Sequence, residues 1–291
     1  MIEPKFVELK TKNGLTLPGL LYQANKTKKV AIYLHGNGGS NGLNNNPRHL
    51  ALANSLNRRG ISILFFNNRG AHIVSQINRK LYGMAYEKIK ECIYDIDGAI
   101  DFLKKLSYKE FYLIGSSTGA NKICVYNFYK PENPVSKYVL LCGGDDVGIY
   151  YDLLKKTKFK KILARAKQKI KSGRGEELSP ELLPSGLIFS YQSFYDIANP
   201  DGNYNIFPYH EVIKKIKLSR KPLFRHFRSI KKPTLVVYGD EDEYAWGDVK
   251  RVVNVLMAYQ PEFEYEIIKG ANHGFDGREV RLTKTVAVWL C

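Results

Sequence analysis

The fold is decided by residues 111–125, which read Phe-Tyr-Leu-Ile-Gly-Ser-Ser-Thr-Gly-Ala-Asn-Lys-Ile-Cys-Val. An apolar, strand-like run passes there through Gly115-Ser-Ser117-Thr-Gly119 into a helix-like segment. The sequence G-x-S-x-G between a strand and a helix predicts a very tight turn with its central serine exposed at the tip. Only small residues fit beside such a turn, which the two glycines provide. We therefore expect Ser117 to be a nucleophile.

Strand-like and helix-like segments alternate around this stretch. Residues 5–22 predict an antiparallel hairpin with its turn at 12–14. The other expected strands are 30–34, 61–66, 111–114, 138–142, 234–238 and 263–268, and the expected helices between or after them are 47–60, 89–103, 246–256 and 280–290. This rhythm predicts the α/β class, with an eight-stranded, mostly parallel sheet flanked by helices.

Composition limits the class of protein. With 291 residues, 44% of them hydrophobic and 25% charged, the chain has enough apolar material for a large buried core. No apolar run approaches the roughly 18 residues of a membrane-spanning helix, and the start of the chain shows no secretory signal, so we expect a cytoplasmic protein. Four scattered cysteines (Cys92, Cys124, Cys142 and Cys291) show no metal-binding or disulfide spacing, so no metal is expected.

Residues 145–232 interrupt the strand-helix rhythm between the sixth and seventh strands. This segment has 19 Lys and Arg against 9 Asp and Glu, a net charge of +10 out of +17 for the chain. We expect helices at 152–171 and near 210–221, and a mainly helical cap inserted into a core formed by 1–144 and 233–291. This segment contains an aromatic stretch at 189–207. Its aromatic residues, with the one that follows, could line a substrate pocket or form the cap's own small core: Tyr191, Phe194, Tyr195, Tyr204, Phe207 and Tyr209. The basic charge could attract an anionic partner, or it could be a solvated helix face.

A glycine-rich turn, His35-Gly-Asn37-Gly-Gly39, follows the apolar strand at 30–34. Acyl transfer requires donors for the negative oxygen of a tetrahedral intermediate, and backbone N–H groups in such a turn are suited to that task. We assign these donors to Asn37 and to Thr118, which follows Ser117 at a helix N-terminus. The alternative, a nucleotide or phosphate loop, lacks its glycine spacing and its lysine. His35 itself is expected to support the turn.

A serine hydroxyl also needs a base, and an imidazole suits this role at neutral pH. Among six histidines, His273 follows the last expected strand and should reach the same sheet edge as Ser117. A carboxylate is required to orient that imidazole. Four acids, residues 240–243, follow the preceding strand, so one of them is expected to approach His273.

Taken together, these motifs resemble the α/β-hydrolase superfamily over residues 28–144 and 233–291. The superfamily's G-x-x-D pattern matches Gly239 to Asp242 and selects Asp242 rather than Asp240, and its G-x-x-H-G-F ending corresponds to 270–275. Residues 67–72 are similar to its D-x-R-G-x-G loop, with Asn67 in place of Asp and His72 in place of Gly. The turn at residues 115–119, Gly-Ser-Ser-Thr-Gly, is also similar to the Gly-His-Ser-Thr-Gly of fungal siderophore-esterase-like hydrolases.

The resemblance implies an esterase-like serine hydrolase with the catalytic residues Ser117, Asp242 and His273 and an oxyanion hole at Asn37 and Thr118. It implies no cofactor and no metal, and a small-molecule ester as substrate, which could be anionic or aromatic. Amide or thioester hydrolysis by the same residues stays open, as does a non-catalytic protein that binds anionic partners through the basic cap. No recognised nucleic-acid-binding module is visible, so nucleic acid is not the expected partner.

Overall fold

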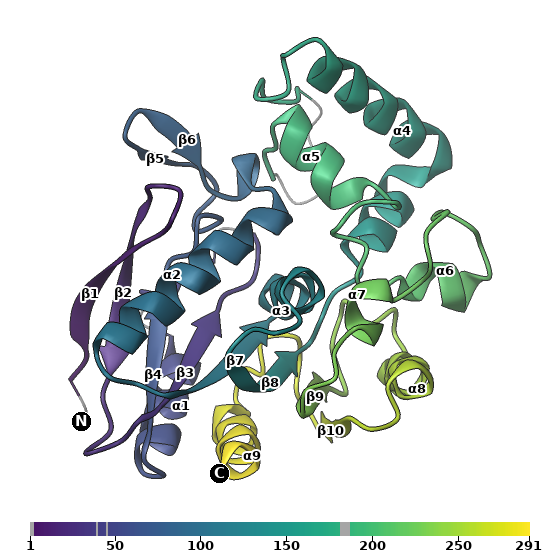
Figure 1. The fold of residues 1–291 in the computed structure, drawn as a ribbon. Helices are drawn as coiled ribbons and strands as arrows, with labels where there is room; N and C mark the ends of the chain where they lie inside the picture. The colour runs from purple at the N-terminus through teal and green to yellow at the C-terminus, as the bar shows by residue number, and fades with distance from the viewer. Residues whose placement is uncertain (1–2, 39, 45, 181–186) are drawn as a thin grey trace.

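The computed structural model describes residues 3–38, 40–44, 46–180 and 187–291 and contains the expected eight-stranded sheet (Figure 1). In spatial order its strands are β1 (Lys5–Lys10), β2 (Thr16–Tyr22), β4 (Ile61–Phe66), β3 (Lys29–Leu34), β7 (Glu110–Ser116), β8 (Val135–Leu141), β9 (Thr234–Gly239) and β10 (Glu264–Ile268). Strand β2 pairs antiparallel with β1 and β4, and the other neighbours are parallel. The carboxyl ends of β3, β7, β8, β9 and β10 consequently meet at one edge.

Helices cover both faces of this sheet. Figure 1 shows α2 (Cys92–Lys105) in front of the sheet and α1 (Pro47–Asn57) behind it. Helix α2 packs on α3 (Thr118–Tyr129), and α1 packs on α9 (Glu279–Leu290). The apolar positions of α2 are buried as its periodicity predicts. Helix α8 (Val249–Tyr259) begins after Asp248, whose carboxylate accepts a hydrogen bond from the Arg251 N–H, so Trp246 precedes the helix instead of lying in it.

The segment between β8 and β9 is helical, but two of its helices differ from their expected ranges. Helix α4 (Asp146–Lys171) begins six residues before 152 because the Asp145 carboxylate caps it by accepting from the Gly148 N–H, and it kinks at Lys155. Helix α6 (Tyr209–Lys214) ends well before 221. The buried Glu211 carboxylate accepts hydrogen bonds from the backbone of residues 218 and 219, which turns the chain back. Short helices α5 (Tyr191–Ala198) and α7 (Arg225–Arg228) complete the segment.

A small hairpin, β5 (Ser75–Ile77) and β6 (Lys80–Tyr82), was not expected from the sequence. Its two turn residues, Asn78 and Arg79, both have positive φ, at 50° and 63°. Such a turn usually contains glycine. Because Asn78 and Arg79 occupy it here, the usual sequence signal of a hairpin is missing. Two 3₁₀ turns, η1 (Met84–Tyr86) and η2 (Ile89–Glu91), lead from this hairpin into α2.

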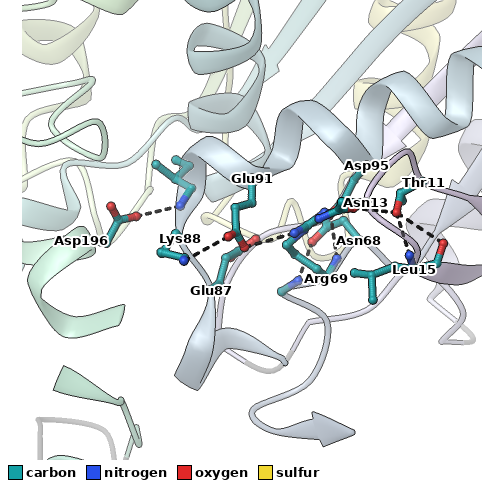
Figure 2. Close-up of polar contacts among 12 residues, drawn as sticks. Thr11, Asn13, Leu15, Asn68, Arg69, Glu87, Lys88, Glu91, Asp95 and Asp196 are labelled. Carbon is teal, nitrogen blue, oxygen red and sulfur yellow. Dashed lines mark hydrogen bonds and ion pairs between the residues drawn. The ribbon is translucent and has the colours of Figure 1, made fainter. Parts of the chain in front are cut away.

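The loop after β4 is anchored by a buried arginine (Figure 2). The Arg69 guanidinium donates to both carboxylate oxygens of Asp95 and to Glu91, and its side chain is only 2% exposed. Asn67, where the resembling superfamily loop has Asp, accepts a hydrogen bond from the Gly42 N–H at 2.7 Å. His72, in place of Gly, has a φ of 64°. The loop thus keeps a left-handed residue at this position despite losing the glycine.

The described residues contain no helix that is both long enough and apolar enough to cross a membrane.

Candidate active site

Ser117 lies at the strained turn between β7 and α3. Its φ of 55° and ψ of −123° fall in a region that non-glycine residues rarely adopt. A Cβ on Gly119 would overlap the carbonyl oxygen of Leu34 at the end of β3, and one on Gly115 would overlap the carbonyl of Gly119. The turn is held by the Ser117 N–H, which donates to the carbonyl of Leu141 on β8 at 2.8 Å. The two glycines therefore allow the serine to protrude beside β3.

His273 follows β10 and is bonded to an acid that follows β9. Its Nδ1 lies 2.9 Å from Oδ1 of Asp242, whose side chain is 1% exposed, while the His273 side chain is 16% exposed. Because a carboxylate only accepts, His273 donates through Nδ1 and leaves Nε2 free to act as a base. Asp240 instead accepts from the N–H groups of Gly270 and Ala271, so it braces the loop that carries His273.

Further contacts, which the sequence did not suggest, orient this pair. The Tyr244 N–H donates to Asp242 Oδ1, and the Tyr244 ring packs edge-on against the His273 imidazole at 4.7 Å between centroids. The Glu243 carboxylate accepts from the His273 N–H at 3.0 Å. Arg48, in the first turn of α1, donates to the carbonyl of Gly274. Glu243 and Tyr244 directly follow Asp242, which is the one sequence signal that could have identified them.

The turn after β3 lies against the serine. A Cβ on Gly36 would be only 3.1 Å from Cβ of Ser117, so the backbone of this turn approaches Ser117 closely. His35 is 2% exposed and its Nδ1 lies 2.8 Å from the Gly36 carbonyl, the supporting role expected for it. Burial lowers the pKa of His35 to about 3, so the ring is neutral at physiological pH. Gly39, the last residue of the motif, lies outside the described residues.

All the predicted site residues except the buried Asp242 line one cavity of about 570 Å³: Asn37, Ser117, Thr118 and His273. Its other walls include Asp146, Ile149, Tyr150 and Leu153 of α4, Leu187 before α5, Tyr244 and Gly274 beside the histidine, and Arg48 of α1. The cavity therefore lies at the carboxyl edge of the sheet, between the core and α4.

The aromatic residues between 191 and 209 do not line this cavity. Tyr191, Phe194, Tyr204, Phe207 and Tyr209 are each at most 3% exposed and belong to the hydrophobic core. Of the two interpretations of this stretch, the structure favours a packed core. Tyr150 and Tyr244 supply the aromatic part of the cavity instead.

One grouping of potential metal ligands occurs in the described part of the chain. Atoms of Cys142, Asp242 and His273 lie within 4.8 Å of one another. Burial and the neighbouring Asp242 raise the pKa of the Cys142 thiol well above its usual value, so it stays protonated. A metal ligand would need the thiolate, and Asp242 is already bonded to His273 and Tyr244, so the grouping fits a hydrogen-bonded acid–histidine pair better than a metal site.

A family of proteins described as "Protein of unknown function (DUF1749)" matches residues 19–290 of this sequence. The chain belongs to the DUF1749 family. None of the curated proteins compared with this DUF1749 chain matches its sequence.

Solved structures show which fold this DUF1749 protein has. It is similar to the α/β hydrolase GrgF from Penicillium sp. sh18, with a TM-score of 0.66 and 16% identity over 98% of this chain and 97% of that one. Est1E from Butyrivibrio proteoclasticus gives a TM-score of 0.64, with 16% identity over 98% and 97% of the two chains. The esterase PF2001 from Pyrococcus furiosus gives 0.58, with 18% identity over 99% and 90%. The chain therefore has the α/β-hydrolase fold that its motifs predicted.

Proposed function

We propose that this protein is a serine hydrolase that cleaves carboxylic esters of small molecules. Ser117 attacks the ester carbonyl while His273 takes its proton, and Asp242 stabilises the imidazolium that forms. The N–H groups of Asn37 and Thr118 bind the oxyanion. His273 then protonates the leaving alcohol, and water releases the acyl group from Ser117 by the same steps in reverse.

The observation that carries this proposal is the convergence of the three residues from three distant parts of the chain. A strained serine and a histidine with its Nδ1 bonded to a buried carboxylate meet at one cavity, which Asn37 and Thr118 also line. The fold alone does not require this arrangement, because the strands could be followed by loops that carry other side chains. Several structures with this fold are named esterases, which supports the ester as substrate.

We further propose that residues 145–232 are a cap on the core formed by 1–144 and 233–291. Helix α4 of this segment contributes Asp146, Ile149 and Tyr150 to the cavity wall, so it would help to select the substrate. One Est1E structure is titled with bound ferulic acid, an aromatic acid. A cavity of about 570 Å³ with two tyrosines could accommodate an aromatic ester of that size.

The test is covalent labelling by a fluorophosphonate, which reacts only with an activated serine. The wild-type protein should be labelled on Ser117, and peptide mapping must place the adduct there rather than on the neighbouring Ser116. Ser117→Ala should abolish labelling and His273→Ala should slow it by about a thousandfold or more. A folded wild-type protein that is not labelled would overturn the proposal.

A panel of matched esters, amides and thioesters then separates the three reactions that this triad can perform. We expect esters to give a higher kcat/KM than amides, because an alcohol leaves more readily than an amine, and the thioester arm of the panel measures the third reaction directly. Higher activity on amides or thioesters would assign the protein to those classes while leaving Ser117 as nucleophile.

A further inference from the structure

Asp146 is the acidic side chain among the described residues that line the Ser117 cavity. It is the first residue of α4, so its backbone is held by the helix and by the Asp145 cap before it. Around it the wall is largely apolar, with Ile149, Leu153 and Leu187 nearby. In such cavities a few fixed polar groups select the orientation of the ligand.

Asn121 fixes the Asp146 carboxyl group in place. The Asn121 Nδ2 donates to Oδ2 of Asp146 at 3.0 Å and to the carbonyl of Gly144 at 3.0 Å. Asn121 lies one helical turn after Ser117 on α3, so the position of Asp146 is tied to the nucleophile's own helix. The bond from Asn121 holds the carboxyl group through Oδ2. The group is thus fixed by α3 where it lines the cavity.

The surroundings of Asp146 favour its neutral form. Its chain neighbour Asp145 is 2% exposed, and Lys122, a cation that favours the charged form of Asp146, is already paired with Glu87 at 2.6 Å. No cation forms an ion pair with Asp146 in the described part of the chain. Burial, followed by repulsion from Asp145, raises the pKa of Asp146 to about 8. A neutral carboxyl group offers an O–H donor as well as an acceptor.

We propose that Asp146 is the polar recognition point of this cavity and that it donates a hydrogen bond to an uncharged oxygen of the substrate. This inference rests on the proposed function, because the substrate is the ester held at Ser117. It specifies that ester as one with a hydroxyl or carbonyl group remote from the scissile bond. An ammonium group at that place would require Asp146 to lose its proton.

The experiment compares esters that differ by one hydroxyl group. Methyl 3-phenylpropanoate is paired with its ring-hydroxylated forms, and a simple alkyl ester with its hydroxyalkyl counterpart. We expect the wild-type protein to prefer at least one hydroxylated ester by about tenfold in kcat/KM, mainly through KM, since a neutral hydrogen bond is worth about that factor. Asp146→Leu should remove the preference, and Asp146→Asn, which keeps a donor in the same place, should retain most of it.

Asp152→Asn is the matched control, because Asp152 is an exposed acid on the same helix that does not line the cavity. This variant should keep the wild-type preference. The rate of fluorophosphonate labelling is measured for every variant, because it reports on Ser117 without any contact to a hydroxyl group. Thermal unfolding checks that each variant is folded.

The outcomes separate the two proposals. An unlabelled wild-type protein would refute the hydrolase function, whereas a labelled protein with equal activity on all pairs would refute only the role of Asp146. A preference that survives in Asp146→Leu would also refute it. Loss of the preference in Asp146→Asn would refute the role of Asp146 as well. If Asp146→Leu does not fold, the result for Asp146→Asn is the deciding one. A wild-type preference for an amino-substituted ester would show a charged carboxylate and overturn the inference.

Discussion

Replacing Lys122 by Met should destabilise the protein strongly, although the substitution changes the side-chain volume little. Lys122, on α3, is 1% exposed, and its Nζ lies 2.6 Å from the Glu87 carboxylate, which is 3% exposed. Its Nζ also donates to Asn68 at 2.9 Å. The substitution leaves Glu87 charged without a partner or forces it to take up a proton in a buried site, and both are costly.

The size of the effect follows from this burial. Removing one partner of a buried ion pair costs about 3 to 5 kcal/mol. The entropy of unfolding is about 2.1 cal/mol/K per residue, or roughly 0.6 kcal/mol/K for a chain of this length. The expected decrease in Tm is therefore about 5 to 8 °C. Substituting both partners, as in Lys122→Met with Glu87→Gln, should recover most of the loss, because no uncompensated charge stays behind.

The control is a second ion pair with the same separation and greater exposure. Lys130 Nζ also lies 2.6 Å from a carboxylate, that of Asp97, but these side chains are 39% and 13% exposed. Lys130→Met should cost less than about 1 kcal/mol, or under about 2 °C in Tm. Differential scanning calorimetry measures all four proteins. Equal decreases for Lys122→Met and Lys130→Met would refute the reasoning, because burial would then not decide the cost, and so would a double variant as unstable as Lys122→Met.

Three other predictions concern the site and the pH dependence of stability. Asp242→Asn should lower kcat for ester hydrolysis by about 10⁴-fold, since the amide no longer fixes the tautomer of His273, whereas Asp240→Asn should have a far smaller effect in the same kinetic assay. Gly119→Ala should slow fluorophosphonate labelling at least a hundredfold, because the new Cβ overlaps the Leu34 carbonyl and must displace the turn; an unchanged rate would show that the turn tolerates a side chain. Burial raises the pKa of Asp196 to about 7, above its value in the unfolded chain, so the folded state binds the proton more tightly. This contribution to the free energy of unfolding is lost as pH rises from about 4 to about 7. Asp196→Asn keeps an acceptor for the Ile89 N–H and should flatten that slope in urea unfolding measured between pH 5 and 8; a slope equal to the wild type's would contradict the assignment.

The core of the fold could be predicted from sequence because its signals are local. Apolar runs and glycines mark the strands and the turn at Ser117, and each of these features is readable from a window of about ten residues. The resemblance of 239–242 and 270–275 to superfamily motifs supplied the pair Asp242 and His273, which the structure places 2.9 Å apart. The meeting of these residues with Ser117 was also predictable, because the loops that follow parallel strands lie at the same edge of the sheet.

Two kinds of feature could not be predicted, namely the contacts of polar side chains inside the fold and a turn that lacks its usual glycine. Helix α6 ends where Glu211 bonds to the backbone of residues 218 and 219, and no local pattern marks Glu211 as buried. The small hairpin turns through Asn78 and Arg79 without glycine. Asp146 follows three residues that could belong to any loop, and its place in the cavity depends on Asn121 of α3. For Glu211 and Asp146 a polar side chain is decisive because of where the folded chain places it. The hairpin was missed because its turn has no glycine.

The excess positive charge of the chain and the charge of the cavity wall favour different substrates. Residues 155–171 of α4 contain eight lysines and one arginine and no acid, and most of these side chains are exposed. The same helix begins with Asp146 on the cavity wall, next to the buried Asp145. An anionic ligand would be attracted at long range by the helix surface, and physiological salt weakens that attraction beyond about 8 Å. At the wall itself the ligand would meet Asp146, the acid of the described lining, in a partly enclosed cavity where interactions are screened less than on the helix surface. Arg48 is the cation of the described lining, and it already donates to the Gly274 carbonyl and to Tyr33. Local chemistry should thus dominate the choice of substrate, and it favours a neutral ester over the anionic one that the overall charge suggests.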